Sequence, residues 1–147
     1  MKRLHIHVRA DDISASEHFY TALFGQAPAV VKSNYVKWML DDPRINFAIS
    51  TQEGNAPGID HLGIQVDSDE ELESVNAALQ AARQHTVAEP DAHCCYARGN
   101  KHWTQDPQGV TWEMFHTMGE AVTYGDVRVD LDAAQAGADP KASACCG

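Results

Sequence analysis

Two pairs of adjacent cysteines, Cys94-Cys95 and Cys145-Cys146, are the residues of this 147-residue chain best suited to bind a soft element. Cα atoms on either side of a trans peptide lie about 3.8 Å apart. That is closer than the roughly 4.4 to 6.8 Å usual for disulfide partners, so we expect free thiols. Because thiolates are soft ligands, Cys94 and Cys95 predict a site for a soft, thiophilic element.

Geometry and ionisation set two conditions for this thiol site. Adjacent side chains of a regular strand point to opposite faces, so two thiols that converge on one ligand need a bend, a loop or a bulge. Thiolate formation also needs local help, since the usual pKa of Cys is about 8.5. Arg98, Lys101 and His93 are near enough in sequence to assist. The alternative is that both cysteines are small buried side chains of a core strand.

A second candidate site involves His5, His61 and Glu113, which lie in three separate strand-like stretches. Two imidazoles and one carboxylate suit a borderline divalent metal and leave coordination positions open, as in the non-haem Fe(II) oxygenases. Zn(II), Mn(II) and Ni(II) are alternative metals. The chain has eight histidines, and the alternative ligands among them are His7, His102 and His116.

An internal repeat explains how the chain would position these residues. Residues 3–9 alternate apolar and polar side chains, as in a strand that presents one polar face. The pattern restarts at residues 59–66, and setting His5 over His61 places Asp12 on Ser68, each before a helical stretch. Equivalent places in a repeat favour a shared role for the two histidines.

Each copy of the repeat reads as a βαβββ module, which predicts an α+β fold of paired modules. The expected helices cover about 13–24 and 69–84, with Gly25 ending the first. The expected strands that follow them cover 29–31, 35–40, 45–50, 86–89, 93–97, 101–105 and 111–116. We therefore predict one domain over 1–118, with module one at 1–52, module two at 59–118, and a flexible tail over 119–147 that carries Cys145 and Cys146.

Charge and hydropathy exclude several classes of partner. The formal net charge of -10 and pI of about 5.0 disfavour binding to nucleic acid and to anionic membranes. No apolar run approaches the roughly 20 residues needed to span a bilayer, and the start MKRLHIHVRADD is too polar for a signal peptide. These features predict a cytoplasmic protein.

Several motifs resemble the vicinal-oxygen-chelate superfamily, which includes glyoxalases, type I extradiol dioxygenases and antibiotic-resistance proteins. The resemblance covers roughly residues 1–118 and implies the paired-module fold. Its carriers are His5 followed by Val8 and Asp12, then Ser16, Phe19-Tyr20 and Leu23-Phe24-Gly25, then Asp60-His61-Leu62-Gly63, and finally Asp106-Pro107-x-Gly109-x-x-Trp112-Glu113.

Within that superfamily, Cys94-Cys95-Tyr96-Ala97 with Lys101 and Trp103 downstream, together with the second pair Cys145-Cys146, resembles the ArsI carbon-arsenic lyases and the related cadmium-induced CadI proteins. The resemblance implies that Cys94 and Cys95 bind a trivalent organoarsenical, such as methylarsenic(III) or an aromatic arsenical. Tyr96 and Lys101 would contribute to the same substrate site.

The same resemblance implies that His5, His61 and Glu113 bind Fe(II), which uses dioxygen to split the carbon-arsenic bond and release arsenite. No catalytic side chain is expected beyond these ligands. Two other functions stay open: a cadmium- or arsenic-binding resistance protein without turnover, and a generic glyoxalase or extradiol dioxygenase. The modules could pair within one chain or between two copies, as in a homodimer.

Overall fold

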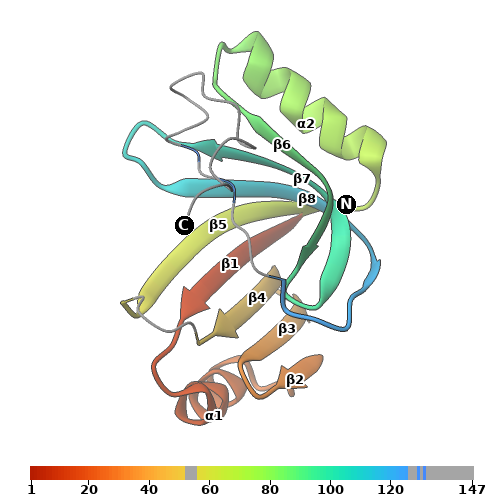
Figure 1. The fold of residues 1–147 in the computed structure, drawn as a ribbon. Helices are drawn as coiled ribbons and strands as arrows, with labels where there is room; N and C mark the ends of the chain where they lie inside the picture. Colours follow the sequence, from red (N-terminus) through yellow and green to blue (C-terminus); the bar gives the residue numbers. More distant parts are fainter. Residues whose placement is uncertain (52–55, 126–128, 130, 132–147) are drawn as a thin grey trace, which may run out of the picture. The chain divides into compact units, whose positions relative to one another are not determined.

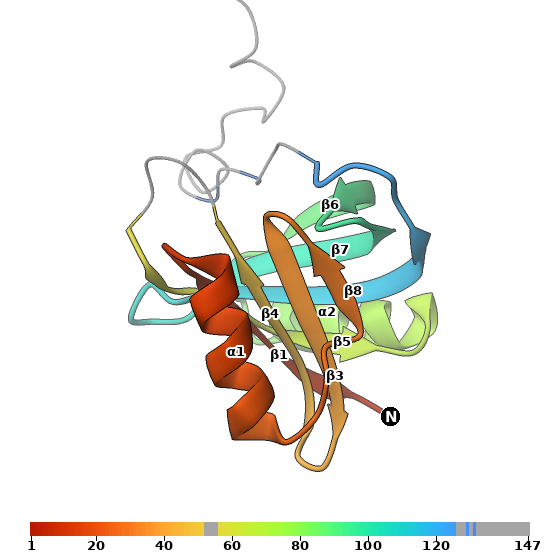
Figure 2. The same cartoon turned by 90° about the horizontal axis from the view of Figure 1, so that it is seen from below.

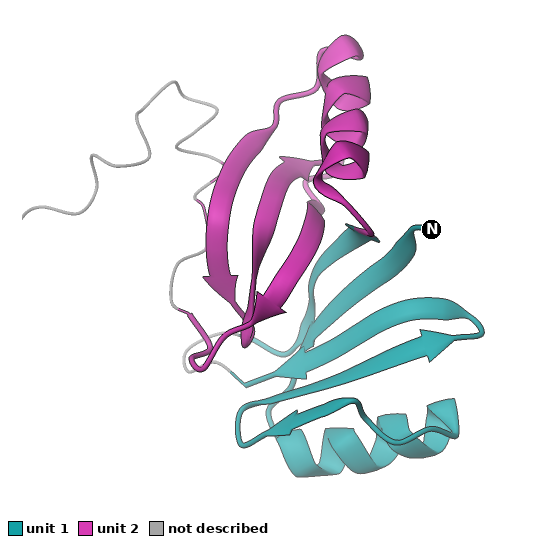
Figure 3. Cartoon of the chain, turned by 90° about the vertical axis from the view of Figure 1, so that its right-hand side faces the viewer, with its two compact units in different colours: residues 1–65 teal, residues 66–147 magenta. Residues whose placement is uncertain are grey.

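The computed structural model describes residues 1–51, 56–125, 129 and 131, in two units, Met1–Gln65 and Val66–Gly147 (Figure 3). The predicted βαβββ order occurs twice along the chain and confirms the α+β fold class (Figure 1). The elements are β1 (Arg3–Arg9), α1 (Ile13–Phe24), β2 (Val30–Lys32), β3 (Tyr35–Asp41), β4 (Arg44–Ser50), β5 (Gly58–Val66), α2 (Asp69–Ala81), β6 (Val87–Cys94), β7 (Ala97–Gln105) and β8 (Thr111–Glu120).

The first unit is a mixed sheet with the strand order β2-β3-β4-β1-β5. β1 pairs in parallel with β4 and antiparallel with β5, so it lies between these two strands in the sheet. α1 packs on one face (Figure 2). The core on that face consists of Val36, Trp38, Leu40, Phe47 and Ile49, with Ile6, Val8, Tyr20 and Phe24 packed against it.

Strict alternation along the strands places polar side chains on the opposite face of this sheet. In β1, Ile6 and Val8 pack against the core under α1, whereas His5 and His7 point to the other side and are only 5% and 3% exposed. In β4 the same alternation buries Asn46 on the histidine side. The predicted polar face of residues 3–9 is therefore present and buried.

Both helices begin directly after the two residues that the repeat aligns, Asp12 and Ser68, and these residues are their N-caps. The Asp12 carboxylate accepts a hydrogen bond from the Ala15 backbone N–H, and the Ser68 hydroxyl accepts one from the Glu71 backbone N–H. α1 ends at Gly25, whose φ of +62° is the left-handed conformation that glycine adopts without a Cβ clash. The repeat alignment of Asp12 with Ser68 is confirmed as a pair of equivalent caps.

The second unit contains a sheet with the order β8-β7-β6, and α2 contacts β7 and β8. Its strands are longer than predicted: β7 begins at Ala97, four residues before the expected strand at 101–105, and β8 continues beyond the expected end at 116. The expected strands at 86–89 and 93–97 are wrong, because one strand, β6, spans Val87–Cys94 and ends in a turn. The pairing of β6 is irregular between Glu89 and Ala92, since Pro90 has no N–H and Asp91 has a φ of +51°.

The predicted tail begins inside β8, which continues to Glu120. Residues 121–125 follow it and make backbone hydrogen bonds to the turn after β6. Cys145 and Cys146 lie outside the described residues. Among the residues that are described, neither helix has the length and apolar character that crossing a membrane would require.

Candidate metal centre and dithiol site

Three buried imidazoles come together on the polar face of the first unit. His5 and His7 extend from β1 and His61 from β5, and one ligand atom of each lies within 4.8 Å of the others. The Nε2 atoms of His5 and His61 are 3.2 Å apart. The structure thus brings together the two histidines that the repeat paired, and adds His7, one of the alternative ligands.

Hydrogen bonds at the far side of each ring determine which nitrogen faces the cluster. Nδ1 of His5 lies 3.0 Å from the backbone oxygen of Asn46, and Nδ1 of His61 lies 2.6 Å from the carboxylate of Asp60. Both partners only accept hydrogen bonds, so each Nδ1 donates a proton. In a neutral ring of this tautomer Nε2 carries a lone pair, so the two Nε2 atoms, 3.2 Å apart, could both bind one cation. This donor set fits a divalent metal ion.

A register shift between β1 and β5 provides the carboxylate partner. His7 pairs with His61, but the next residue, Val8, pairs with Ile59, so Asp60 is an extra residue in β5. The Asp60 side chain is 3% exposed and also forms an ion pair with Arg9. Such a carboxylate-histidine contact holds a metal-binding imidazole in one tautomer and one orientation.

His7 has a different set of contacts. Its Nε2 lies 2.8 Å from the hydroxyl oxygen of Ser50, and its ring centroid is 4.9 Å from that of His61. The other two alternative ligands lie in the second unit, where His102 contacts Glu73 at 2.9 Å and His116 contacts Asp69 at 3.0 Å. Both of those carboxylates belong to α2.

Cys94 and Cys95 converge because they lie in a tight turn. Cys94 pairs with Ala97, and the two central residues, Cys95 and Tyr96, have φ values of +57° and +60°. Positive φ at both central positions is the condition for a type I′ turn, which is compatible with the twist of a hairpin. The two Sγ atoms are 3.0 Å apart, whereas a disulfide bond is about 2.05 Å long, and both thiols are free.

The two thiols differ in acidity. A hydrogen bond from the Cys95 thiol, opposed by burial and helped by the positive charge of Lys101, lowers the pKa of Cys94 to about 7. The same hydrogen bond and burial raise the pKa of Cys95 well above its usual value. At pH 7 about half of the molecules therefore carry a thiolate at Cys94, whereas Cys95 keeps its proton.

Lys101 and Glu113 form a buried ion pair in the second unit. Lys101 Nζ lies 2.5 Å from a Glu113 carboxylate oxygen, and the side chains are 10% and 5% exposed. Burial lowers the pKa of Lys101, but the charges of Glu113 and Cys94 outweigh this and raise it above its usual value. Lys101 is thus a permanent cation near the thiols. The Lys101 Nζ also lies 5.4 Å from the Trp103 ring centroid.

Arg98, His93 and Tyr96 are the other residues suggested for the thiol site. Arg98 and His93 are more than half exposed and lie 3.3 Å and 4.0 Å from the carboxylate of Asp91. Of the three residues suggested to promote ionisation, Lys101 is the one whose charge lowers the pKa of Cys94. The Tyr96 ring makes an edge contact with Tyr124, with ring centroids 5.9 Å apart.

Sequence reasoning did not assign a role to Asp60 or to residues 121–125. The signal for Asp60 was its place directly before His61 in the motif Asp60-His61-Leu62-Gly63. Nothing in the composition of residues 121–125 indicated their contact with the cysteine turn.

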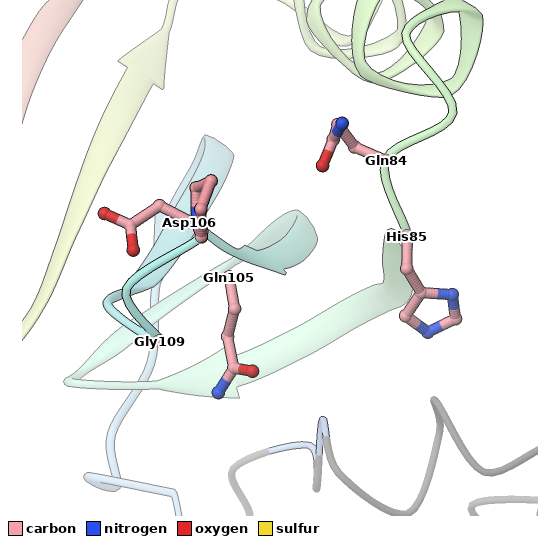
Figure 4. Close-up of a pocket in the computed structure, with 6 residues that line it drawn as sticks. Gln84, His85, Gln105, Asp106 and Gly109 are labelled. Atoms are coloured by element: carbon pink, nitrogen blue, oxygen red, sulfur yellow. The ribbon is translucent and has the colours of Figure 1, made fainter.

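An open cavity of about 690 Å³ lies elsewhere in the second unit, without a thiol in its lining (Figure 4). Gln84, His85 and Gln105 border it together with the turn that begins at Asp106. The Asp106 carboxylate accepts hydrogen bonds from the backbone N–H groups of Val110 and Gln108, which lower its pKa. These hydrogen bonds stabilise the turn, and this structural role explains the aspartate at position 106.

Comparison with known proteins agrees with this architecture. Residues 2–114 match the family model of the Glyoxalase/Bleomycin resistance protein/Dioxygenase superfamily. An extradiol ring-cleaving dioxygenase from B. fuscum has a TM-score of 0.60 at 16% identity, over 81% of this chain and 33% of that chain. A Mn(II)-bound glyoxalase from Novosphingobium aromaticivorans has a TM-score of 0.58 at 17% identity, over 88% of this chain and 44% of that one.

Curated relatives are more similar in sequence. The chain is 36% identical over 119 residues to the trivalent organoarsenical cleaving enzyme of Bacillus sp. (strain MD1), covering 80% of this chain and 74% of the relative. It is 30% identical over 146 residues to the cadmium-induced protein CadI of Mycobacterium bovis, covering 99% of this chain and 93% of the relative. With its two βαβββ modules and this match over residues 2–114, the chain belongs to the Glyoxalase/Bleomycin resistance protein/Dioxygenase superfamily.

Proposed function

We propose that this protein is an Fe(II)- and dioxygen-dependent carbon-arsenic lyase that binds trivalent organoarsenicals through Cys94 and Cys95 and releases arsenite. The observation that carries the proposal is the pair of thiols in one turn, with Sγ atoms 3.0 Å apart and the pKa of Cys94 lowered to about 7. The names of relatives at 33% to 36% identity support the substrate class. Free vicinal thiols suit a reducing compartment, so we propose that it acts in the cytoplasm.

Substrate capture follows from the chemistry of the dithiol. A trivalent organoarsenical with two hydroxyl groups can exchange both for thiolates and keep its carbon substituent. Two arsenic-oxygen bonds break and two arsenic-sulfur bonds form. One hydroxyl group leaves as water with the proton of Cys95, and the other takes a proton from solvent, because Cys94 has already released its own. Arsenic stays trivalent throughout. Cys94 attacks first because it is the ionised thiol, and Cys95 provides the proton for the first departing hydroxyl group.

His5 and His61 would hold the metal through their Nε2 atoms, with Glu113 as the proposed carboxylate ligand and His7 as the alternative third ligand. A bound Fe(II) ion would supply redox chemistry with dioxygen. The role of the chain is to hold both imidazoles in one orientation, through the bonds from Nδ1 to Asn46 and Asp60, so that each Nε2 faces the ion.

Turnover of methylarsenous acid tests the proposal. The Fe(II)-loaded protein is mixed with substrate in the presence of a reductant, air is admitted, and arsenite is measured by chromatography with element-specific detection. We expect many arsenite molecules per protein. Cys94→Ser and Cys95→Ser should each remove capture and turnover, whereas His61→Ala should remove turnover and leave capture by the thiols. His102→Ala is the matched control, since that imidazole contacts Glu73.

Two other outcomes would point to the rival functions. Stoichiometric binding of arsenic without any arsenite would end the enzyme claim and leave sequestration of As(III) or Cd(II), a role that the CadI relatives make a specific alternative. If activity toward a thiol-free organic substrate survived replacement of both cysteines, and arsenicals never bound, the protein would be a generic glyoxalase or dioxygenase.

A further inference from the structure

The chain returns to the cysteine turn after β8 ends at Glu120. Residues 121–125, which we call the return segment, form two backbone hydrogen bonds with the centre of that turn. The N–H of Ala121 donates to the carbonyl oxygen of Tyr96 at 2.8 Å, and the N–H of Cys95 donates to the carbonyl oxygen of Tyr124 at 2.5 Å. Both central residues of the turn are therefore bound to the same segment.

Gly125 allows the return segment to approach this closely. Its φ is +78°, and a Cβ atom at this position would lie 1.8 Å from the backbone oxygen of His93 and 3.1 Å from the Cα of Cys94. Those atoms belong to the last residues of β6. The Tyr124 ring adds an edge contact with the Tyr96 ring, at 5.9 Å between centroids. Backbone thus packs on backbone directly beside the first thiol.

The cysteine turn needs such support because of its residue types. Cys95 and Tyr96 both adopt left-handed backbone conformations, which are unfavourable for residues that carry a Cβ. Turns of this type usually have Asn-Gly, Asp-Gly or Gly-Gly at these two positions. A turn built from Cys and Tyr persists where surrounding structure holds it. Both bonds from the return segment act at these two residues.

We propose that the return segment is a positioning element of the arsenical site, in which Tyr124 and Gly125 hold the cysteine turn so that both thiols reach one arsenic atom. This inference rests on the proposed function for the identity of the ligand. The two residues do not touch the arsenic; they act through the backbone of Cys95 and Tyr96. Loss of the contact would convert a two-thiol site into two single thiols, which bind arsenic far less tightly because the second bond is no longer intramolecular.

Gly125→Ala and Gly119→Ala form a matched pair of variants that tests this role. A Cβ at Gly125 collides with His93, whereas a Cβ at Gly119 has no heavy atom within 4 Å. All proteins carry Cys145→Ser and Cys146→Ser so that the remaining thiols are Cys94 and Cys95. The probe is phenylarsenous acid, and its binding is compared with complete alkylation by iodoacetamide, which needs only single thiols.

We expect Gly125→Ala to weaken binding of phenylarsenous acid by about tenfold or more, while both thiols still alkylate fully. Hydrogen exchange of the Cys95 amide should also become faster, since its bond to Tyr124 is lost. Gly119→Ala should match the parent protein in all three measurements. A variant that was merely less stable would not lose arsenical binding, which needs both thiols, while keeping full alkylation, which needs only single thiols.

Failure of this inference and failure of the proposed function are distinguishable. If the parent protein does not bind phenylarsenous acid through Cys94 and Cys95, the proposed function fails. If the parent binds it and folded Gly125→Ala binds it equally tightly, the positioning role is overturned. Should Gly125→Ala not fold, as judged by circular dichroism, Ala121→Pro decides. That change removes the N–H donated to Tyr96; weaker binding supports the role, and unchanged binding overturns it.

Discussion

At the scale of single residues, the two thiols are chemically unequal although they are neighbours in sequence. The Cys95 thiol donates to Cys94, and Lys101 adds positive charge, so the pKa of Cys94 falls to about 7 while that of Cys95 rises. One proton shared by two sulfur atoms gives a nucleophile and a proton donor in the same turn. An arsenical with two hydroxyl leaving groups needs both.

Alkylation of Cys94 as a function of pH should reveal this asymmetry. In a chain with Cys145→Ser and Cys146→Ser, the rate with iodoacetamide should rise with pH to a midpoint of about 7, because the thiolate is the reactive form. Cys95→Ala should move the midpoint upward, since the donated hydrogen bond is lost. A midpoint back at the usual value of about 8.5 would reduce the rate at pH 7 by about sixteenfold.

Cys95→Ser is the control for that experiment, because a serine hydroxyl still donates a hydrogen bond. It should keep most of the lowered midpoint. An unchanged midpoint in Cys95→Ala would show that the neighbouring thiol does not stabilise the Cys94 thiolate.

At the scale of secondary structure, the repeat is visible in how each helix begins. Asp12 and Ser68 occupy equivalent positions, and each accepts a hydrogen bond from the backbone N–H three residues later. The helices then pack on the sheet of their own unit, α1 against β3 and β4 and α2 against β7 and β8. The caps therefore determine where each helix starts and which of its side chains face the sheet.

Asp12→Ala and Ser68→Ala should each lower the free energy of unfolding by about 1 kcal/mol, because each leaves a backbone N–H of the first turn without its side-chain acceptor. Urea denaturation monitored by circular dichroism measures the change. Asp11→Ala removes the same charge one residue earlier, and that residue is exposed. If Asp11→Ala cost as much as Asp12→Ala, the effect would come from charge and the cap would be unimportant.

At the scale of the whole molecule, folding is what brings the candidate metal ligands together. His5 and His61 are separated by 56 positions in sequence, yet their Nε2 atoms lie 3.2 Å apart. A ligand that binds only the folded protein stabilises it by mass action, by about 2.7 kcal/mol at a concentration one hundred times its Kd. Metal binding should therefore appear as increased thermal stability.

Mn(II), a redox-stable substitute for Fe(II), should raise the melting temperature of the wild-type protein in differential scanning fluorimetry. His5→Ala and His61→Ala should abolish the increase, and His102→Ala should preserve it. Glu113→Gln should reduce it sharply if the carboxylate is the third ligand, whereas His7→Gln should do so if three imidazoles bind the ion. An increase that persists in His61→Ala would mean that the metal binds elsewhere.

The sequence by itself determined the features that depend on near neighbours. Alternation along residues 3–9, the helix starts after Asp12 and Ser68, and the glycine that ends α1 all depend on interactions within a few positions, so they could be predicted. The repeat also predicted that His5 and His61 share a role, because equivalent strands of related modules occupy equivalent positions. The paired βαβββ fold followed from the same reasoning.

Only the tertiary structure decided how the site residues are oriented. The tautomer of His5 depends on the backbone of Asn46, which is 41 positions away, and that of His61 on an extra residue in the pairing of β1 with β5. The sequence placed the cysteines in a strand, because their turn contains none of the usual turn-forming residues. Hydrogen bonds from residues 121 and 124 hold its left-handed conformation instead. Partners distant in the sequence leave no periodic signal, so only the folded chain reveals them.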